Sequence, residues 1–331
     1  MPTNSASRLP EKIAERLRLP LIAAPMLRVS GPELVIAACR GGVIGAFPAA
    51  NARSIEQLDD WMTQIENALA EKTDSERLPA AYCPNLIIRR AELREELGCV
   101  LKHKVELVIT SVGSPEGVVG PLHDIGCLVF ADVATVRHAH KAIAAGSDGL
   151  ILLTTGAGGN TGWLNPIAFV RAVREFFDGP IVMAGGMSDG AALWAAQVLG
   201  CDLAYMGTQF IATNESMAAP EYRQMIVESG IDDIQLTRAL TGLETNMLRP
   251  SLIAAGLDPV ALSDRASPED AAGRYGRAAK DPGPRRWKDL WSAGHSVSGV
   301  KKIQSAAELI DQTEREYREA RARTAQLLVD R

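Results

Sequence analysis

The chain has 331 residues, of which 47% are hydrophobic and 23% charged, and its formal net charge is -5 at pH 7. This balance predicts a large globular core and gives no basic stripe for nucleic-acid binding. No run reaches the roughly 18 apolar residues that a membrane helix needs, and no signal-peptide core stands at the N-terminus. Because the five cysteines are scattered without a C-x-x-C pair, we expect buried thiols in a cytoplasmic protein.

Short apolar runs recur along the chain, and each is followed by Gly, Pro or Asn and then by a stretch of helical periodicity. The runs predict strands at residues 20–25, 42–47, 80–88, 105–111, 127–132, 149–155, 180–186 and 202–208. The periodic stretches predict helices at 31–40, 54–71, 89–102, 115–125, 135–145, 165–177, 188–199 and 218–229. Continuous apolar strands that alternate with helices indicate a parallel sheet covered on both faces. This number of units fits an α/β fold with a closed (β/α)8 TIM barrel, and an open doubly wound sheet is the alternative.

The strand–helix alternation ends near Thr213. A polar, Pro- and Gly-rich passage follows and predicts an extension over the barrel mouth. Apolar residues at helical spacing near the C-terminus predict a surface helix. The predicted parts are a helical segment at 1–19, the barrel at 20–230, an extension that contributes to the substrate pocket at 231–300, and the C-terminal helix at 301–331.

Glycines follow the last two predicted strands, in MAGGMSDG (183–190) and YMGTQF (205–210). The active site of such a barrel lies at the C-terminal ends of its strands. The backbone N–H groups of Gly185, Gly186 and Gly207 therefore predict a phosphate cradle beside helix N-termini. The alternative is that each glycine only makes a tight turn.

A third glycine-rich stretch, TTGAGGNTGWLNP (154–166), follows the sixth predicted strand. It is not a Rossmann G-x-G-x-x-G motif, because Thr161 stands at the third glycine and the motif belongs after the first strand. The sequence also lacks G-x-S-x-G, Walker A and H-E-x-x-H motifs. His138 and His140 are two residues apart on a predicted helix and face different ways, so no metal site is predicted.

Together these motifs resemble the nitronate monooxygenase family, formerly 2-nitropropane dioxygenases, over residues 20–215. The resemblance implies a TIM barrel that binds FMN non-covalently. The FMN phosphate would lie on the glycine cradle and Thr208, and the flavin ring over Ala-Pro-Met at 24–26, with a hydrogen bond from Asn85. The implied cofactor-binding residues are Ala24, Pro25, Met26, Asn85, Asp132, Gly158, Gly159, Gly185, Gly186, Gly207 and Thr208.

Two positions depart from the family pattern. The loop after strand six carries a general-base His in the family, whereas this chain has Asn160, whose amide cannot remove a carbon-bound proton near neutral pH. At the end of strand five many relatives carry a Lys, and this chain has Asp132. We expect an anion there, which would disfavour an anionic reduced flavin.

Three interpretations of the function remain open. In the first, the protein oxidises an alkyl nitronate with O2, and Asn160 binds the substrate oxygens. In the second, it is an NAD(P)H-dependent FMN reductase of an enone, enoyl thioester or quinone, and Tyr205, His295 or water donates a proton. In the third, it is an FMN-binding or assembly protein without activity.

Several further residues have two interpretations. His295 lies in a predicted loop over the barrel mouth. There it would act as a substitute acid or base, or as a hydrogen-bonding group. Trp163 and Trp291 wall the substrate pocket or pack in the core. A basic set in the extension binds a long anionic substrate or forms a solvated face; it comprises Arg238, Arg249, Arg285, Arg286 and Lys288. The expected partner is a small-molecule substrate, and a homodimer is one assembly open to the protein.

Overall fold

Eight parallel strands close into a barrel in the computed structural model, which describes residues 8–71, 77–262, 266–275 and 283–329. The strand order around the barrel is β1-β2-β3-β4-β5-β6-β8-β9, so neighbours in sequence are neighbours in space. The closed barrel is confirmed, and the open sheet is wrong. The barrel strands are β1 (Leu21–Ala23), β2 (Ile44–Pro48), β3 (Tyr82–Ile87), β4 (Leu107–Ser111), β5 (Leu128–Val133), β6 (Gly149–Leu153), β8 (Ile181–Ala184) and β9 (Leu203–Met206).

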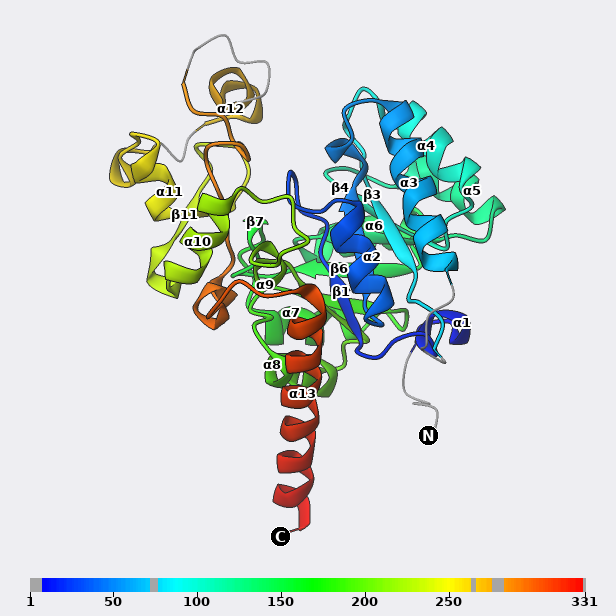
Figure 1. Cartoon of the computed structure of the whole chain (residues 1–331). Coiled ribbons are helices and arrows are strands. Elements are labelled where there is room, and N and C mark those ends of the chain that lie inside the picture. The colour runs from blue at the N-terminus through cyan, green and yellow to red at the C-terminus, as the bar shows by residue number, and fades with distance from the viewer. Residues whose placement is uncertain (1–7, 72–76, 263–265, 276–282, 330–331) are drawn as a thin grey trace.

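Helices follow the barrel strands and cover them from outside (Figure 1). Polar caps set several of their starts: the Ser54 hydroxyl accepts from Gln57 N, and Asn165 caps a helix that opens with Pro166. The helices are α2 (Pro32–Arg40), α3 (Ile55–Ala70), α4 (Leu93–Lys102), α5 (Glu116–Asp124), α6 (Val136–Ala144), α7 (Pro166–Arg174), α8 (Gly190–Leu199), α9 (Thr208–Ile211) and α10 (Pro220–Glu228).

The N-terminal end of the barrel is closed by the chain's own start. Helix α1 (Glu11–Ala14) brings Ile13 against the apolar barrel interior, and Leu9 joins the same cluster. Residues 1–7 of the predicted helical segment lie outside the described residues. The interior itself is filled by Ile22, Ile44, Ala46, Cys83, Leu107, Ile109, Phe130, Ile151, Val182, Ala184 and Leu203. This packing leaves the opposite, C-terminal end for a ligand.

The extension adds a small antiparallel sheet to the barrel mouth. Strands β10 (Ile234–Thr237) and β11 (Thr245–Leu248) pair with each other, and β11 pairs with β7 (Gly159–Asn160) from the glycine-rich stretch. Helices α11 (Arg249–Ala254) and α12 (Pro268–Tyr275) follow, and Figure 1 shows them in one lobe with β11 and α10. The predicted bare loop is therefore partly a strand of the extension.

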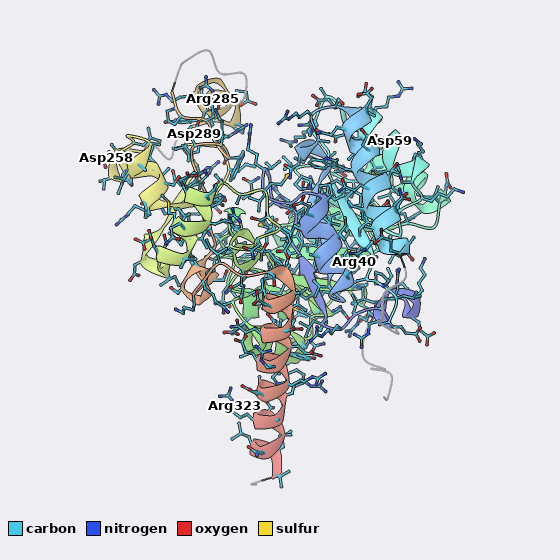
Figure 2. All side chains as sticks on the ribbon, in the orientation of Figure 1. Arg40, Asp59, Asp258, Arg285, Asp289 and Arg323 are labelled. Carbon is cyan, nitrogen blue, oxygen red and sulfur yellow. The ribbon has the colours of Figure 1, made fainter. Side chains whose placement is uncertain are left out.

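Helix α13 (Ala306–Val329) confirms the predicted C-terminal helix. Its buried face packs on α8, where Trp194 Nε1 donates to Thr324 Oγ1 at 3.0 Å and the Tyr317 hydroxyl bonds Gln197. The helix then continues away from the barrel, and Arg323 marks this outer part in Figure 2. No helix among the described residues is long and apolar enough to cross a membrane.

Candidate active site

A cavity of about 810 Å³ opens at the C-terminal ends of the barrel strands. Its floor comes from the strand ends, and its other side comes from residues of the extension. This volume lies in the usual range for ligand sites. Floor residues include Ala24, Pro48, Asn85, Ser111, Asp132, Leu153, Ala184 and Tyr205, and extension residues include Arg238, Leu243, Glu244, Trp287, Trp291, Ser292, Ala293 and Ser296.

Three neighbouring strands each place a polar side chain on the cavity floor. Side chains alternate along a strand, so residues two beyond the interior Cys83, Ile109 and Phe130 also point inward. These are Asn85 on β3, Ser111 on β4 and Asp132 on β5. The Asn85 amide donates to Ser111 Oγ at 3.2 Å. The cavity therefore presents an amide, a hydroxyl and a carboxyl side by side to whatever lies on its floor.

Asp132 differs from its neighbours because its Oδ1 atom is buried and has no hydrogen-bond partner in the described part of the chain. Burial raises the pKa of this carboxyl from its ordinary value to about 7. This direction argues against the fixed anion expected from the sequence. A buried polar atom without a partner is costly, and a bound ligand is one way to supply it.

In the predicted phosphate cradle the backbone is open at Gly186, whereas Gly185 is packed, since a Cβ atom there would lie 2.4 Å from Thr154 Oγ1. Gly185 and Gly186 have φ values of +119° and +75°, and a Cβ atom on Gly186 would meet no protein atom within 4 Å. Thr208 Oγ1 accepts a hydrogen bond from Gly294 N at 3.0 Å, so the extension closes over the cradle. The cradle residues Gly185, Gly186, Gly207 and Thr208 all line the cavity.

The start of helix α8 is already used by the protein. Gly190 N donates to Glu316 Oε2 of α13 at 3.1 Å, and Ala192 N donates to the Asp189 cap at 2.8 Å. This helix N-terminus is therefore less available to a phosphate than predicted, and phosphate binding by the preceding glycines stays a prediction. The sequence could not place Glu316, because α13 lies more than 120 residues away along the chain.

These features fit FMN. The glycine cradle suits a phosphate, and Ala24, Pro25 and Met26 give the cavity a low apolar wall against which a flat ring can lie. The unpartnered Asp132 Oδ1 can face a polar edge of the ring system. Every cofactor-binding residue implied by the resemblance lines the same cavity.

The glycine-rich stretch approaches protein backbone as well as the cavity. A Cβ atom on Gly158 would lie 2.7 Å from Gly294 N, and His295 N donates to Gly156 O at 2.9 Å. Asn246 Nδ2 of β11 donates to Ala157 O at 2.8 Å. The glycines therefore allow residues 293–295 and β11 to pack on this stretch, a cause that the sequence did not reveal.

Asn160 lines the cavity from strand β7. Its backbone pairs with Thr245 of β11, and its Oδ1 lies 3.3 Å from Thr245 Oγ1, whose single proton is shared between this oxygen and Leu243 O at 3.0 Å. With Oδ1 engaged, the amide nitrogen is the donor that Asn160 can offer to a ligand. Thr245 is fully buried, so it can hold this orientation.

His295 is not among the residues that line the cavity, although Ser296 beside it is. Its ring lies behind Gly156, where an added Cβ atom would be 3.0 Å from His295 Nδ1. The geometry does not support the predicted role as a substitute acid or base. Trp163 and Trp291 both line the cavity; Trp163 is 66% exposed and Trp291 stacks on Tyr222.

The basic residues of the extension contribute less than expected. Of the five, only Arg238 lines the cavity. Arg286 donates to Leu240 O at 3.3 Å. Instead, three residues that the sequence did not single out as ligand-binding line the cavity rim, namely Arg89 after β3 and His138 and Lys141 on α6. His138 and Lys141 are three apart and so share a helix face, a signal that was available once α6 was placed after β5.

A separate ionisable cluster lies on the outer helices α3 and α4. Asp59, Cys99 and His103 have ligand-type atoms within 4.8 Å of one another. However, Lys102 Nζ contacts both Asp59 oxygens at 2.7 and 2.8 Å, and His103 bridges Asp59 and Glu66. These pairings give the cluster a structural role between the helices; Asp59 is labelled in Figure 2.

An eight-stranded parallel barrel with a glycine cradle and a partly polar floor defines an oxidoreductase-type TIM barrel suited to a flavin nucleotide. The family model described as nitronate monooxygenase matches residues 11–315. The chain therefore belongs to the nitronate monooxygenase family and is an oxidoreductase of this kind, as the motifs over 20–215 predicted.

Individual relatives agree with this assignment. A nitronate monooxygenase of Paraburkholderia phytofirmans is 27% identical, over 91% of this chain and 93% of that protein. The structure of a nitroalkane oxidase from Streptomyces ansochromogenes is similar, with a TM-score of 0.76 and 22% identity over 93% of this chain and 98% of that one. FabK from Thermotoga maritima has a TM-score of 0.75 and 21% identity, over 96% of this chain and 99% of that one. The two structures support the fold.

Proposed function

We propose that this protein binds FMN and oxidises an alkyl nitronate with O2, without a histidine base. The observation that carries the proposal is the amide of Asn160, which lines the cavity on a strand paired with β11 and has its Oδ1 within reach of the Thr245 hydroxyl. A nitronate arrives without its α-proton, so its oxidation requires hydrogen bonds to its oxygens rather than a group that removes a proton. An oriented amide nitrogen supplies such a bond.

The cationic rim supports an anionic substrate. Arg89, His138 and Lys141 line the same cavity, and Arg89 and Lys141 carry positive charge at neutral pH. Arg238 adds a further cationic side chain and Glu244 an acidic one, and a local excess of positive charge raises the concentration of anionic ligands. The neutral nitroalkane would gain nothing from this attraction, whereas its nitronate would.

In this mechanism each part of the chain has a separate task. The backbone amides of Gly185, Gly186 and Gly207 would hold the FMN phosphate, and bound FMN would supply the electron acceptor. Asn160 binds and orients the nitronate oxygens. Trp287 and Trp291 of the extension narrow the cavity and limit access of water.

Anaerobic mixing tests the proposal directly. Purified protein should be yellow and release FMN, rather than FAD, on heating. A nitronate added without O2 should bleach the flavin, and air should restore its colour. Bleaching by NADH or NADPH, with none by the nitronate, would overturn the proposal in favour of an NAD(P)H-dependent FMN reductase of an enone, enoyl thioester or quinone.

Asn160→His tests whether this position faces the reacting carbon. The imidazole restores a group that can accept a proton near neutral pH, so the variant should gain turnover of the neutral nitroalkane, by about 10²-fold or more. Asn160→Gln is the matched control, because it keeps an amide and adds no base. Turnover is measured as O2 consumption with each substrate form. Equal nitroalkane rates in the two folded variants would contradict the placement.

A further inference from the structure

Asp132 has no task in the mechanism above, although its position is unusual. It stands at the C-terminal end of β5, in the inward-facing row that continues from Phe130, and it lines the cavity. Its neighbours Asn85 and Ser111 bond each other, whereas Asp132 Oδ1 is buried and bonds nothing in the described structure. A carboxyl left in this way costs stability unless a ligand or a proton compensates it.

The groups that face Asp132 do not hold it as an anion. Its electrostatic neighbours are Cys83 on β3 and Tyr205 on β9, and burial raises the pKa of both well above their ordinary values. Both are therefore neutral near pH 7. Among the described residues no cation contributes to the raised pKa of Asp132, which is about 7, because desolvation is its cause. The charge state of Asp132 is consequently free to respond to a charge that develops in the cavity.

We propose that Asp132 takes up a proton when electrons enter the flavin bound in this cavity, so that flavin reduction is coupled to protonation of this carboxyl. Reduction adds negative charge near Asp132, which disfavours its carboxylate form. Linkage is reciprocal: if electrons strengthen proton binding at Asp132, protonation of Asp132 strengthens electron binding by the same factor. Asp132 therefore removes the repulsion that a fixed anion would impose on the reduced cofactor.

The balance of the step is simple. The electron pair comes from the reductant, which is the nitronate in the proposed reaction. One proton comes from solvent, forms an O–H bond on the Asp132 carboxylate and leaves again when O2 reoxidises the flavin. No bond of the substrate is broken by Asp132, which acts through the cofactor as a positioning and charge-compensating residue.

Infrared difference spectroscopy on the FMN-loaded protein tests this. Dithionite serves as reductant at about pH 7, near the pKa of Asp132. The reduced-minus-oxidised spectrum should gain the C=O band of a protonated carboxyl in the natural protein. Asp132→Asn, an amide of similar shape that cannot ionise, should lose this gain. Glu244→Gln, the same exchange at another carboxylate that lines the cavity, should keep it.

The midpoint potential of the bound flavin gives a second measurement. It should fall more steeply with pH in the natural protein than in Asp132→Asn, because one extra proton accompanies the electrons. No carboxyl band in the natural protein, or the same band and slope in Asp132→Asn, would overturn the proposal. If the variant does not retain FMN, absence of the carboxyl band in the natural protein still overturns the proposal.

This inference rests on the FMN binding of the proposed function and not on its substrate. Because dithionite replaces the substrate, a protein that fails to oxidise nitronates can still show the coupling. A protein that oxidises nitronates without the carboxyl band would refute the coupling alone.

Discussion

The two ends of the barrel each hold an aspartate with a buried carboxyl oxygen, and only one of these two carboxyl groups is paired with other protein groups. At the closed end Asp202 is fully engaged: Arg174 Nη2 lies 2.5 Å from Oδ2, and the backbone amides of Arg8 and Ile181 donate to the carboxylate at 2.9 Å. At the open end Asp132 Oδ1 has no partner within the described chain. Both side chains carry the same carboxyl group. Its surroundings decide whether it stabilises the fold or is left available to a ligand.

This difference separates a structural polar group from a functional one. Asp202 joins β9 to the N-terminal segment and to α7, so it stabilises the end of the barrel opposite the cavity. Asp132 lies on the cavity floor, at the end of the barrel where active sites are built. The buried carboxylate of Asp202 is hydrogen-bonded, as stability requires, whereas Asp132 Oδ1 is not. Such an exception is expected at a functional site.

The largest effect should come from a charge in the phosphate cradle. Gly186→Asp places a carboxylate where the cavity is open, and it should abolish FMN retention through repulsion of the phosphate. Gly126→Asp is the matched control, because Gly126 has the same φ of +75° and equally open surroundings, in the turn between α5 and β5. Flavin content per protein, read from absorbance, checks both.

Backbone strain is common to these two variants, at roughly 1 kcal/mol each. If both lost FMN equally, strain or misfolding rather than charge in the cradle would be the cause. Full FMN content in Gly186→Asp would show that the FMN phosphate does not bind at Gly186.

Much of the open end could be predicted from sequence. The strands that carry the floor are continuous apolar runs, and the rule that active sites lie at their C-terminal ends placed Asn85, Asp132 and Gly186 in one cavity. Asn160 could be recognised because its motif kept its spacing although its chemistry changed. These are local patterns, which depend on residues close together in the sequence.

The remaining features depend on contacts between distant segments. The glycines near 158 serve the packing of Gly294, and Glu316 caps α8; neither contact has a local signature. The loop of His295 lies at the cavity as predicted, but the direction of its ring, which packs against Gly156, depends on tertiary packing and has no local signature. The raised pKa of Asp132 follows from the burial of its carboxyl, which the sequence pattern alone does not give.

At the closed end, Arg174→Met should cost stability without affecting the flavin. The side chains of Arg174 and Asp202 are 7% and 2% exposed, so removal of the arginine leaves a buried charge, at a cost of about 3–5 kcal/mol. Denaturant unfolding measures the loss. Arg171→Met, on the exposed face of the same helix, should change stability by less than about 0.5 kcal/mol. A comparable loss in both variants would show that the ion pair is not the cause.

Asp132→Asn should raise the stability of the protein, whereas Arg174→Met lowers it. The gain should be smaller and should depend on pH. The native pKa of Asp132, about 7, lies above its ordinary value of 3.8, so the folded protein binds this proton more tightly than the unfolded chain. The carboxyl therefore costs no stability below about pH 4, and stability falls as pH rises towards 7, by at most about 4 kcal/mol.

The difference between natural apoprotein and Asp132→Asn isolates this group, because all other titrations are shared. Urea unfolding should give similar stabilities near about pH 4 and a more stable variant near about pH 7.5. A constant difference would mean that Asp132 keeps one charge state throughout. A variant that weakens with rising pH would mean that the carboxylate has a stabilising partner, and the two ends of the barrel would then treat their aspartates alike.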